Sequence, residues 1–507
     1  MPTNLLVEPI LNVATAPTTL PGLLASLSRG DPNVRLSGVR QHQGYAVHTY
    51  LVTLAALALV KADAGLEVSP PVEEKAWFDL LSNLTEGHPT AWDLVVSDPT
   101  LPAFCQPPVY GEVLKKWKDG PGRTEPSTKD SFPGWSLQRT PDECDIYSTA
   151  ANHAPKARAM THPDAEHWVW TLINLQTSAA SPEGFHRAAT RTGPSGRVYV
   201  GFRPGTLDEA SWFLRDLAIL RSQRTHLLYR YRANGHAVLS LLPWDGNKQI
   251  NSRDLDPFYL DVARIVRLVP SPFGNPNLMA WTGSRSKKND LRVSRTLGNT
   301  GDIWTPLKTT KNGISAFVTD ETGFRYDKIH EIMYGEHGCP PAAHVRPVDG
   351  AEPVFYVAGL VLDQKHAANS LGFHERMLPV QPHCYAEGSP EHNRLATKSI
   401  SMVQAVSVAE DCLREALRQM FPKKGTPPKD QPILHTYIDE YDRMVDGLYF
   451  EFLFGSGSQA DWVTTLVNLA LKILERAEMQ LPLTKRIKAS ALAFNVFDEA
   501  KSKQLTL

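Results

Sequence analysis

Apolar residues recur at helical spacing in four segments near the C-terminal end of the chain. The clearest apolar stripes are Ala409, Cys412, Leu413, Ala416, Leu417 and Met420, and then Trp462, Leu466, Leu469 and Ile473. This three-four spacing is typical of amphipathic helices. It predicts helices at 394–421, 431–454, 459–480 and 483–503. Breaks at PKKGTPPKD, at Gly455-SGS and at Leu481-Pro482 separate these segments, so they predict an up-and-down four-helix bundle whose stripes form the core.

The preceding residues mix helical and extended patterns. Helices are predicted at 40–62, 71–84, 166–180 and 208–222, and strands at 4–13, 198–203, 236–243, 314–319 and 353–361. The strand at 4–13 should be followed by a turn at Glu8-Pro9. Residues 101–165 are Pro-rich and irregular, which is typical of functional or partner-ordered segments. The expected fold class is α+β: a large, mixed, loop-rich N-terminal domain at 1–388, followed by a four-helix bundle at 389–507.

The composition is that of a soluble globular protein. Of 507 residues, 42% are hydrophobic and 21% charged, and the formal net charge is −1. A free-standing DNA-binding domain usually has a basic surplus, so any nucleic-acid surface must be a local patch. The N-terminus lacks the pattern of a signal peptide, and the most apolar stretch, 50–61, is about half the length that spans a bilayer. The five cysteines include no CxxC pair, so we expect a cytoplasmic protein with free thiols and no membrane contact.

The sequence holds no strong catalytic signature. It contains no GxxxxGK[ST], no GxSxG and no HExxH motif. His337, Cys339 and His344 are close together, but their spacing matches no common zinc pattern. We therefore expect no enzyme activity, no cofactor and no metal. A metal-dependent hydrolase using these three residues remains the alternative from another class, and a purely structural docking scaffold is a third.

Basic residues gather mostly in segments predicted to be loops, and one further cluster, Lys485, Arg486 and Lys488, begins the last predicted helix. These clusters are Lys115, Lys116 and Lys118; Lys156 and Arg158; Arg187, Arg191 and Arg197; Arg285, Lys287 and Lys288; Lys423, Lys424 and Lys429; and Lys485, Arg486 and Lys488. One such run is usually a solvated surface. Several runs in loops favour contacts with a phosphate backbone, because such contacts supply most sequence-independent affinity for nucleic acids.

Several segments resemble, in order, those of the CasA family, the large subunit of the type I-E CRISPR surveillance complex called Cascade. They are NLLVEPILNV at 4–13, PAFCQ at 102–106, Trp281-Thr282-Gly283, Trp304-Thr305-Pro306, Ala316-Phe317-Val318-Thr319, VAGLVLDQKHAAN at 357–369 and the four C-terminal helices. No single segment is diagnostic. Their collinear order over nearly the whole chain carries the resemblance.

The resemblance implies a non-catalytic subunit that recognises the short motif beside a DNA target (the PAM) and wedges the duplex open to start the R-loop. Its implied partners are double-stranded target DNA, the CRISPR RNA-containing Cascade subunits (backbone, 5′-handle-binding and small subunits) and an effector helicase–nuclease. In this family a glycine loop, a lysine finger and a glutamine wedge touch the motif. By position these are 184–196 (with Gly184, Gly193 and Gly196), Lys287 or Lys288, and Gln364 followed by Lys365.

The chain departs from the family in two places. His186-Arg187-Ala188 stands where glycines are expected, so Arg187 or Arg191 could contact phosphate in place of a backbone contact to a base. Some members carry a cysteine-rich zinc cluster before the lysine finger, whereas the matching stretch at 269–280 has no cysteine, so no zinc is expected there. Lys115, Lys116, Lys156 and Arg158 are the expected weaker contacts to the DNA backbone.

Overall fold

The structure, a computed structural model, divides into two compact units. Unit 1 comprises residues 1–323 and 336–382, and unit 2 comprises 324–335 and 383–507. The residues that the structure describes are 4–13, 16–63, 65, 68–122, 131–145, 163–178, 191, 196–204, 208–243, 250–271, 278–283, 298–343, 353–362, 370–378, 388–421 and 432–504. The mixed α/β fold followed by C-terminal helices confirms the predicted fold class.

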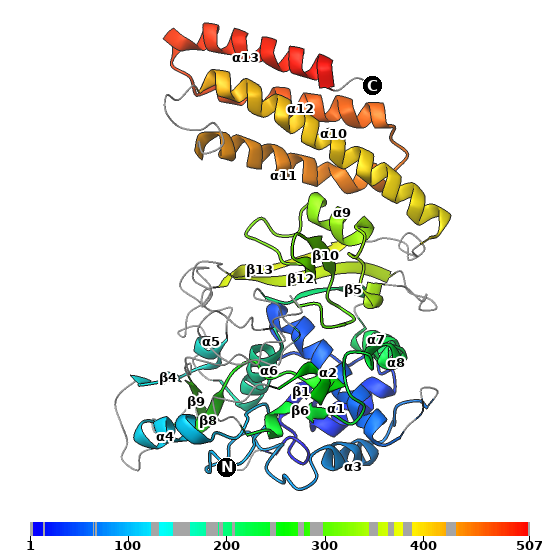
Figure 1. Ribbon diagram of the computed structural model, residues 1–507, viewed down its shortest axis with the longest axis vertical. Helices are drawn as coiled ribbons and strands as arrows, with labels where there is room; N and C mark the ends of the chain where they lie inside the picture. Colours follow the sequence, from blue (N-terminus) through cyan, green and yellow to red (C-terminus); the bar gives the residue numbers. More distant parts are fainter. Residues whose placement is uncertain are drawn as a thin grey trace. The chain divides into compact units, whose positions relative to one another are not determined.

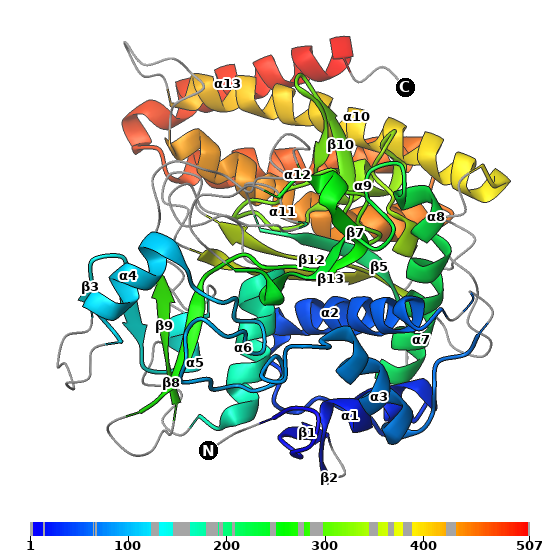
Figure 2. The ribbon, with the colours of Figure 1, turned by 60° about the horizontal axis from the view of Figure 1, so that its bottom comes forward.

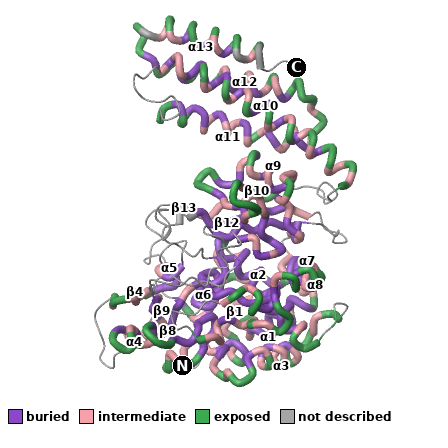
Figure 3. The backbone as a smooth tube through the Cα atoms, viewed as in Figure 1, coloured by how far each residue is buried: buried purple, intermediate pink, exposed green. Residues whose placement is uncertain are grey.

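The centre of unit 1 is the helix α2 (Gln41–Lys61), which is apolar on almost every face. It packs against α3 (Glu74–Leu84), α6 (Ala165–Thr177) and α7 (Glu209–Ser222). Among the described helices, α2 alone is long and apolar enough to cross a membrane, but 89% of its most apolar window is buried inside the protein. That burial is what a core helix shows, as predicted for 40–62, and Figure 3 shows α2 and α6 buried along most of their length.

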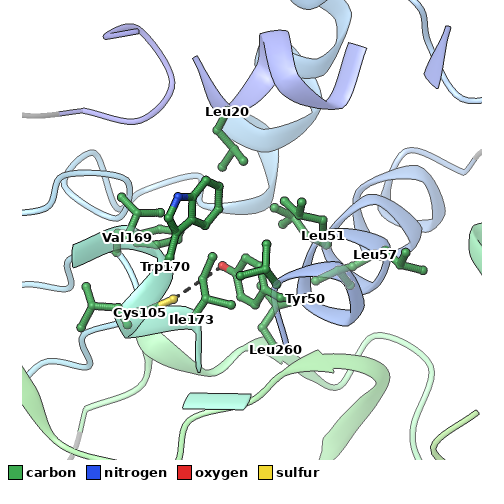
Figure 4. Packing of buried hydrophobic residues seen from close by; sticks show 14 of the residues in the cluster. Leu20, Tyr50, Leu51, Leu57, Cys105, Val169, Trp170, Ile173 and Leu260 are labelled. Carbon is green, nitrogen blue, oxygen red and sulfur yellow. Dashed lines mark hydrogen bonds between the residues drawn. The ribbon is translucent and has the colours of Figure 1, made fainter. Parts of the chain in front are cut away.

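Aromatic and aliphatic side chains from distant segments fill this core. Figure 4 shows Tyr50 of α2 beside Trp170 and Ile173 of α6, and Leu20 of α1 (Leu20–Ser28) nearby. The thiol of Cys105 lies 3.7 Å from the hydroxyl of Tyr50. Trp77, Trp168 and Trp170 are fully buried, and each large side chain removed from water stabilises the fold by about 2–3 kcal/mol.

A three-stranded antiparallel sheet of order β13-β12-β5 lies over α2 (Figure 2). Its strands are β5 (Val198–Pro204), β12 (Pro353–Leu362) and β13 (Ser370–Leu378). β12 and β13 are the stems of the hairpin that the sequence placed at 357–369. Because β12 pairs on both sides, it is the central strand, which fits its run of apolar residues.

A second, four-stranded sheet has the order β3-β4-β9-β8. Its strands are β3 (Ser131–Phe132), β4 (Trp135–Gln138), β8 (Val266–Pro270) and β9 (Leu278–Gly283). The described part of unit 1 also contains three strand pairs: β1 (Leu11–Val13) with β2 (Ala16–Thr18), β6 (His236–Val238) with β7 (Leu255–Leu260), and β10 (Leu307–Thr310) with β11 (Gly313–Ala316).

Two expectations about unit 1 were wrong. The first strand follows the turn at Glu8-Pro9 instead of preceding it, because the side chain of Asn4 accepts the backbone N–H of Leu6 and holds the first residues in a turn. Residues 101–165 are not uniformly irregular, since they contain α4 (Gly111–Asp119), β3, β4 and α5 (Pro141–Cys144). These elements are too short to give a clear period in the sequence.

Unit 2 contains the four helices predicted near the C-terminus. They are α10 (Pro390–Met420), α11 (Pro432–Phe454), α12 (Gln459–Met479) and α13 (Leu483–Gln504). The long helix α10 packs against each of the other three, and α11 and α13 lie on opposite sides of it (Figure 1). The capping box of Ser458 and Asp461 explains why α12 starts where it does.

A fifth helix joins this bundle from an earlier part of the chain. α9 (Tyr326–Tyr334) packs on α10 and α11. Arg325 donates to Asp439 at 2.6 Å, the backbone N–H of Tyr326 donates to Asp446 at 2.7 Å, and His330 is 2.6 Å from the hydroxyl of Ser399. The predicted domain boundary at 388 left residues 324–335 outside the bundle. Nothing local in the sequence shows that this helix docks there.

The α9–α11 contact contains a carboxyl group with a shifted pKa. Burial raises the pKa of Asp442 to about 7, helped by the carboxylates of Glu410, Asp327 and Asp439, and the Arg325 guanidinium 4.0 Å away opposes the shift. The Oδ1 atom of Asp442 is buried with no hydrogen-bond partner in the described part of unit 2. The ionised form of Asp442 is therefore unfavourable in the folded state.

We expect Asp442→Asn to stabilise the protein in a pH-dependent way. The folded state keeps a proton that the unfolded chain loses near pH 4, so the stability from this group falls as pH rises from about 4 through about 7. The neutral amide should raise the free energy of unfolding by about 1–2 kcal/mol more at pH 8 than at pH 5, after allowance for partial exposure. Thermal unfolding at both pH values measures this. The exposed Asp411→Asn on α10 is the control, and an equal gain at both pH values would contradict the prediction.

Candidate nucleic-acid interface

Two buried arginines lie toward the C-terminal end of the predicted glycine loop, one within it and one directly after it. Gly184, Arg187 and Gly193 lie outside the described residues. Arg191 is 7% exposed, and its guanidinium donates to Asp261 at 2.9 Å and to the carbonyl of Tyr259 at 2.7 Å. Its backbone N–H also donates to Asp261. The expected phosphate contact of Arg191 does not fit this position, because its charge is already paired inside the protein.

The second arginine, Arg197, directly follows the loop. Arg197 is 3% exposed and donates two hydrogen bonds to Asp302, at 2.9 and 2.6 Å. Thr305 donates to the same carboxylate. Gly196 has no room for a side chain, since a Cβ atom there would lie 2.5 Å from the carbonyl oxygen of Leu360. Glycine at 196 is therefore needed for close packing on β12.

The two ion pairs form one electrostatic cluster. Burial raises the pKa of Asp261, and the charges of Arg191 and Arg197 partly offset this rise. Burial also lowers the pKa of Arg197, but the combined attraction of Asp302, Tyr199 and Asp261 outweighs burial, and the net shift is upward. The guanidinium of Arg191 lies 4.0 Å from the centre of the Tyr259 ring. Each buried guanidinium of this cluster is therefore matched by a buried carboxylate.

The sheet and the two ion pairs bring together the chain segments that lead into the glycine loop, the lysine finger and the glutamine wedge. Because β5 and β12 are antiparallel, the start of β5 lies beside the end of β12, where Val198 pairs with Gly359. The glycine loop leads into that start. The hairpin tip, 363–369, leaves from the same end of the sheet, since Leu362 and Ser370 are cross-strand partners.

The basic segment returns to the same place. It begins after Gly283, the last residue of β9, and ends before Gly298. Asp302, four residues beyond Gly298, is the partner of Arg197. The carbonyl of Trp304 accepts the backbone N–H of Val200 at 2.9 Å. Lys287, Lys288, Gln364 and Lys365 themselves lie outside the described residues, but the segments that carry them start or end at one edge of unit 1.

The lysines of α4 lie on its outer face. Val113 and Trp117 of this helix are buried, and Trp117 packs edge-on against Trp135 at 4.9 Å between ring centres. Lys115 is exposed and Lys116 is half-buried. This arrangement leaves the lysine charges accessible to a ligand. Lys156 and Arg158, the other expected backbone contacts, lie outside the described residues.

No cluster of the described residues has the geometry of a metal site. His337 lies 4.0 Å from the carboxylate of its neighbour Glu336, and His344 lies outside the described residues. In the described ranges no three His, Cys, Asp or Glu side chains are placed to hold a metal. Burial raises the pKa of the Cys105 and Cys144 thiols to about 12, which disfavours nucleophilic thiolates.

Two buried histidine–aspartate pairs are structural. His42 is 2.8 Å from Asp145, and His48 is 2.9 Å from Asp216. Asp216 also accepts the indole N–H of Trp304 at 2.8 Å. Each pair ties α2 to another segment of unit 1. Sequence reasoning missed these partners and those of Arg191 and Arg197, because nothing in the local pattern marks them.

Comparison with known proteins shows the fold. No protein-family model and no curated protein matches the sequence. The structure is similar to CasA of Thermus thermophilus, with 14% identity and a TM-score of 0.62 over 99% of this chain and 100% of that one. It is also similar to Cse1 of Thermobifida fusca (13%, TM-score 0.60, 99% and 98%). A chain of a CRISPR RNA-guided surveillance complex matches at 15% identity and TM-score 0.56 over 100% of both chains. The chain has the CasA fold over its whole length.

Proposed function

We propose that this chain is the large subunit of an RNA-guided type I-E CRISPR complex. In this role it recognises the PAM of double-stranded target DNA, wedges the duplex open to start the R-loop and helps recruit the effector helicase–nuclease. It performs no catalysis of its own. The CasA fold and its match to a chain of an RNA-guided surveillance complex support the assignment.

One observation carries the proposal. The glycine loop, the segment with Lys287 and Lys288, and the hairpin tip each start or end at the same end of the β13-β12-β5 sheet. Gly196 packs on Leu360, which joins the glycine loop to the hairpin stem, and Arg197 binds Asp302, which joins it to the basic segment. A motif of a few base pairs needs its contacts from one small surface. A wedge also needs a rigid stem, because unstacking a base step costs a few kcal/mol.

The electrostatics favour DNA binding within an assembly. With a net charge of −1, the isolated chain attracts DNA weakly. Within a complex, the CRISPR RNA-bearing subunits hold the guide, and guide–target pairing roughly replaces the DNA pairing that is lost on opening. The large subunit then has to supply only motif contacts and the first unstacking.

Reconstitution tests the proposal directly. The remaining subunits and their CRISPR RNA are assembled with and without this chain, and binding to duplex target is measured. We expect tight, PAM-dependent binding only with the chain present. Single-stranded target is the control, because it needs no opening and should bind both assemblies. Equal duplex binding with and without the chain would overturn the proposal.

We expect the double change Lys115→Ala/Lys116→Ala to weaken duplex binding without changing motif preference. Loss of phosphate contacts should reduce affinity a few-fold for every target sequence and lower the slope of log affinity against log salt by about 1–2. Binding of a PAM library at several salt concentrations measures both effects. Lys75→Ala on α3, another exposed lysine, is the control. An unchanged salt slope would show that α4 is only a solvated face.

A further inference from the structure

A cavity of about 290 Å³ lies in unit 1, between α1, α2, α7 and the sheet formed by β5 and β13. Its walls include Leu27, Leu51, Tyr45, Trp212 and Phe213. The volume and the mostly apolar lining with a few polar groups are those of a small-molecule site. None of the DNA-contacting segments proposed above lines this cavity.

A glycine inside a helix keeps the cavity open. Gly44 lies near the start of α2 and lines the cavity, and a Cβ atom there would meet nothing within 4 Å. Alanine at this position would favour the helix, because glycine loses more backbone entropy on folding. Packing therefore does not require glycine at 44, and the missing side chain leaves this part of the cavity wider.

The polar groups of the cavity leave an excess of negative charge. Arg203 binds Glu209 at 3.1 Å, while Glu375 accepts from Tyr45 at 2.5 Å and from Gln41 at 2.8 Å. Glu209 is thus paired with this guanidinium, whereas Glu375 forms no ion pair with the described residues of unit 1. The Oε2 atom of Glu209 has no hydrogen-bond partner in the described ranges of unit 1.

The other basic side chains of the lining have carboxylate partners outside it. Arg40 is bound to Asp142, and His48 is bound to Asp216. Burial raises the pKa of Tyr45, and the nearby Glu375 carboxylate raises it further, so the phenol stays a neutral donor. The field inside the cavity therefore favours a positive charge.

A buried donor in the wall lacks an acceptor. Trp212 is 2% exposed, and its indole N–H has no hydrogen-bond partner in the described part of the chain. Its ring is stacked on His48, with ring centres 3.4 Å apart. Buried donors are rarely left unpaired in folded proteins, so this N–H is available to an acceptor on a bound molecule.

We propose that this cavity binds a small organic cation with an apolar or aromatic body and a hydrogen-bond acceptor. The ammonium group lies beside Glu209 and Glu375, the body packs on Trp212 and Phe213, and the acceptor takes the indole N–H of Trp212. This binding goes beyond the proposed DNA-related function and does not depend on it.

The test uses two probes with the same phenol body and opposite charge. Tyramine carries an ammonium group, and 3-(4-hydroxyphenyl)propionate carries a carboxylate. Thermal unfolding and calorimetry of the full-length chain are measured with each probe. We expect tyramine at millimolar concentration to raise Tm by about 1–3 °C, since a ligand that binds only the folded state stabilises it. The carboxylate probe should bind at least tenfold more weakly, and equal binding of both probes or no effect of tyramine would overturn the proposal.

Variants locate the binding within the chain. Glu209→Gln combined with Glu375→Gln removes both charges and should weaken tyramine binding at least tenfold. Gly44→Leu fills the open space beside α2 and should abolish binding. Gly447→Leu is the matched control, because Gly447 is also helical with nothing within 4 Å but lies in unit 2. Unchanged tyramine binding in the folded charge variant or in Gly44→Leu would overturn the proposal, and the charge variant preserves the test if Gly44→Leu does not fold.

Discussion

Alanine at Gln364, Lys287 and Lys288 together should reduce PAM-dependent binding of duplex target by the assembled complex at least about 100-fold. A side chain that contacts a base edge typically contributes about 1–3 kcal/mol, and roughly 1.4 kcal/mol corresponds to a factor of ten. The triple variant removes two separate contact elements, the finger and the wedge. Their segments start or end beside Arg197 and Leu360, so both contacts are lost from one surface.

Single changes should separate the two roles. Gln364→Ala should impair binding of intact duplex but spare a target that is already unpaired beside the PAM, because only the intact duplex needs a wedge. Lys287→Ala with Lys288→Ala should relax the choice of PAM on both targets. Minor-groove acceptors form a degenerate pattern, so the loss of specificity should be partial.

Equilibrium binding to intact and pre-opened targets, over a library of PAM sequences, measures these effects. Lys311→Ala is a matched control, because Lys311 lies in the turn of the β10–β11 hairpin and is exposed. Wild-type affinity of the triple variant for intact duplex would remove the finger and the wedge from the proposed mechanism.

Breaking the buried Arg197–Asp302 pair should destabilise the protein strongly. Arg197→Met leaves the carboxylate of Asp302, 8% exposed, without its main partner. Removing one member of a buried ion pair typically costs about 3–5 kcal/mol, because the other charge remains desolvated. The double variant Arg197→Met/Asp302→Leu should recover most of this loss, since an apolar replacement removes both charges.

Denaturant unfolding of the two variants and the parent chain measures the effect. The exposed pair Arg394–Glu391 supplies the control, where Arg394→Met should cost less than about 1 kcal/mol. If Arg197→Met were as stable as the parent chain, the pair would not be a buried, energetically coupled unit.

The recovered double variant also tests the role of the pair in positioning the loops. It should fold but bind duplex target about tenfold more weakly, because the glycine loop and the basic segment lose their shared tether. Restoring Arg197 and Asp302 together should restore binding. A stable double variant with full affinity would show that the ion pair serves stability alone.

Local sequence patterns determined the helices, because the apolar spacing of a helix repeats every three or four residues. The four bundle helices were predicted with nearly the bounds observed, because three-four apolar spacing and Pro or Gly breaks act within a few residues. The buried helix around Tyr50 followed from its unbroken apolar run. The order of short segments along the chain also implied the CasA fold, which the comparisons then showed.

The tertiary structure alone decided which charges are available for binding. In the sequence, Arg191 and Arg197 look like the other basic residues of loops, yet each is buried against a carboxylate, 70 and 105 residues away. The docking of α9 on the bundle and the negative cavity beside Gly44 likewise depend on partners far along the chain. Periodicity and composition report local preference, whereas the burial and pairing of a charge depend on which distant segments the fold brings together. For this reason the sequence determined the helices and strands and their order. The fold determined that the three proposed DNA-contacting segments start or end beside one another.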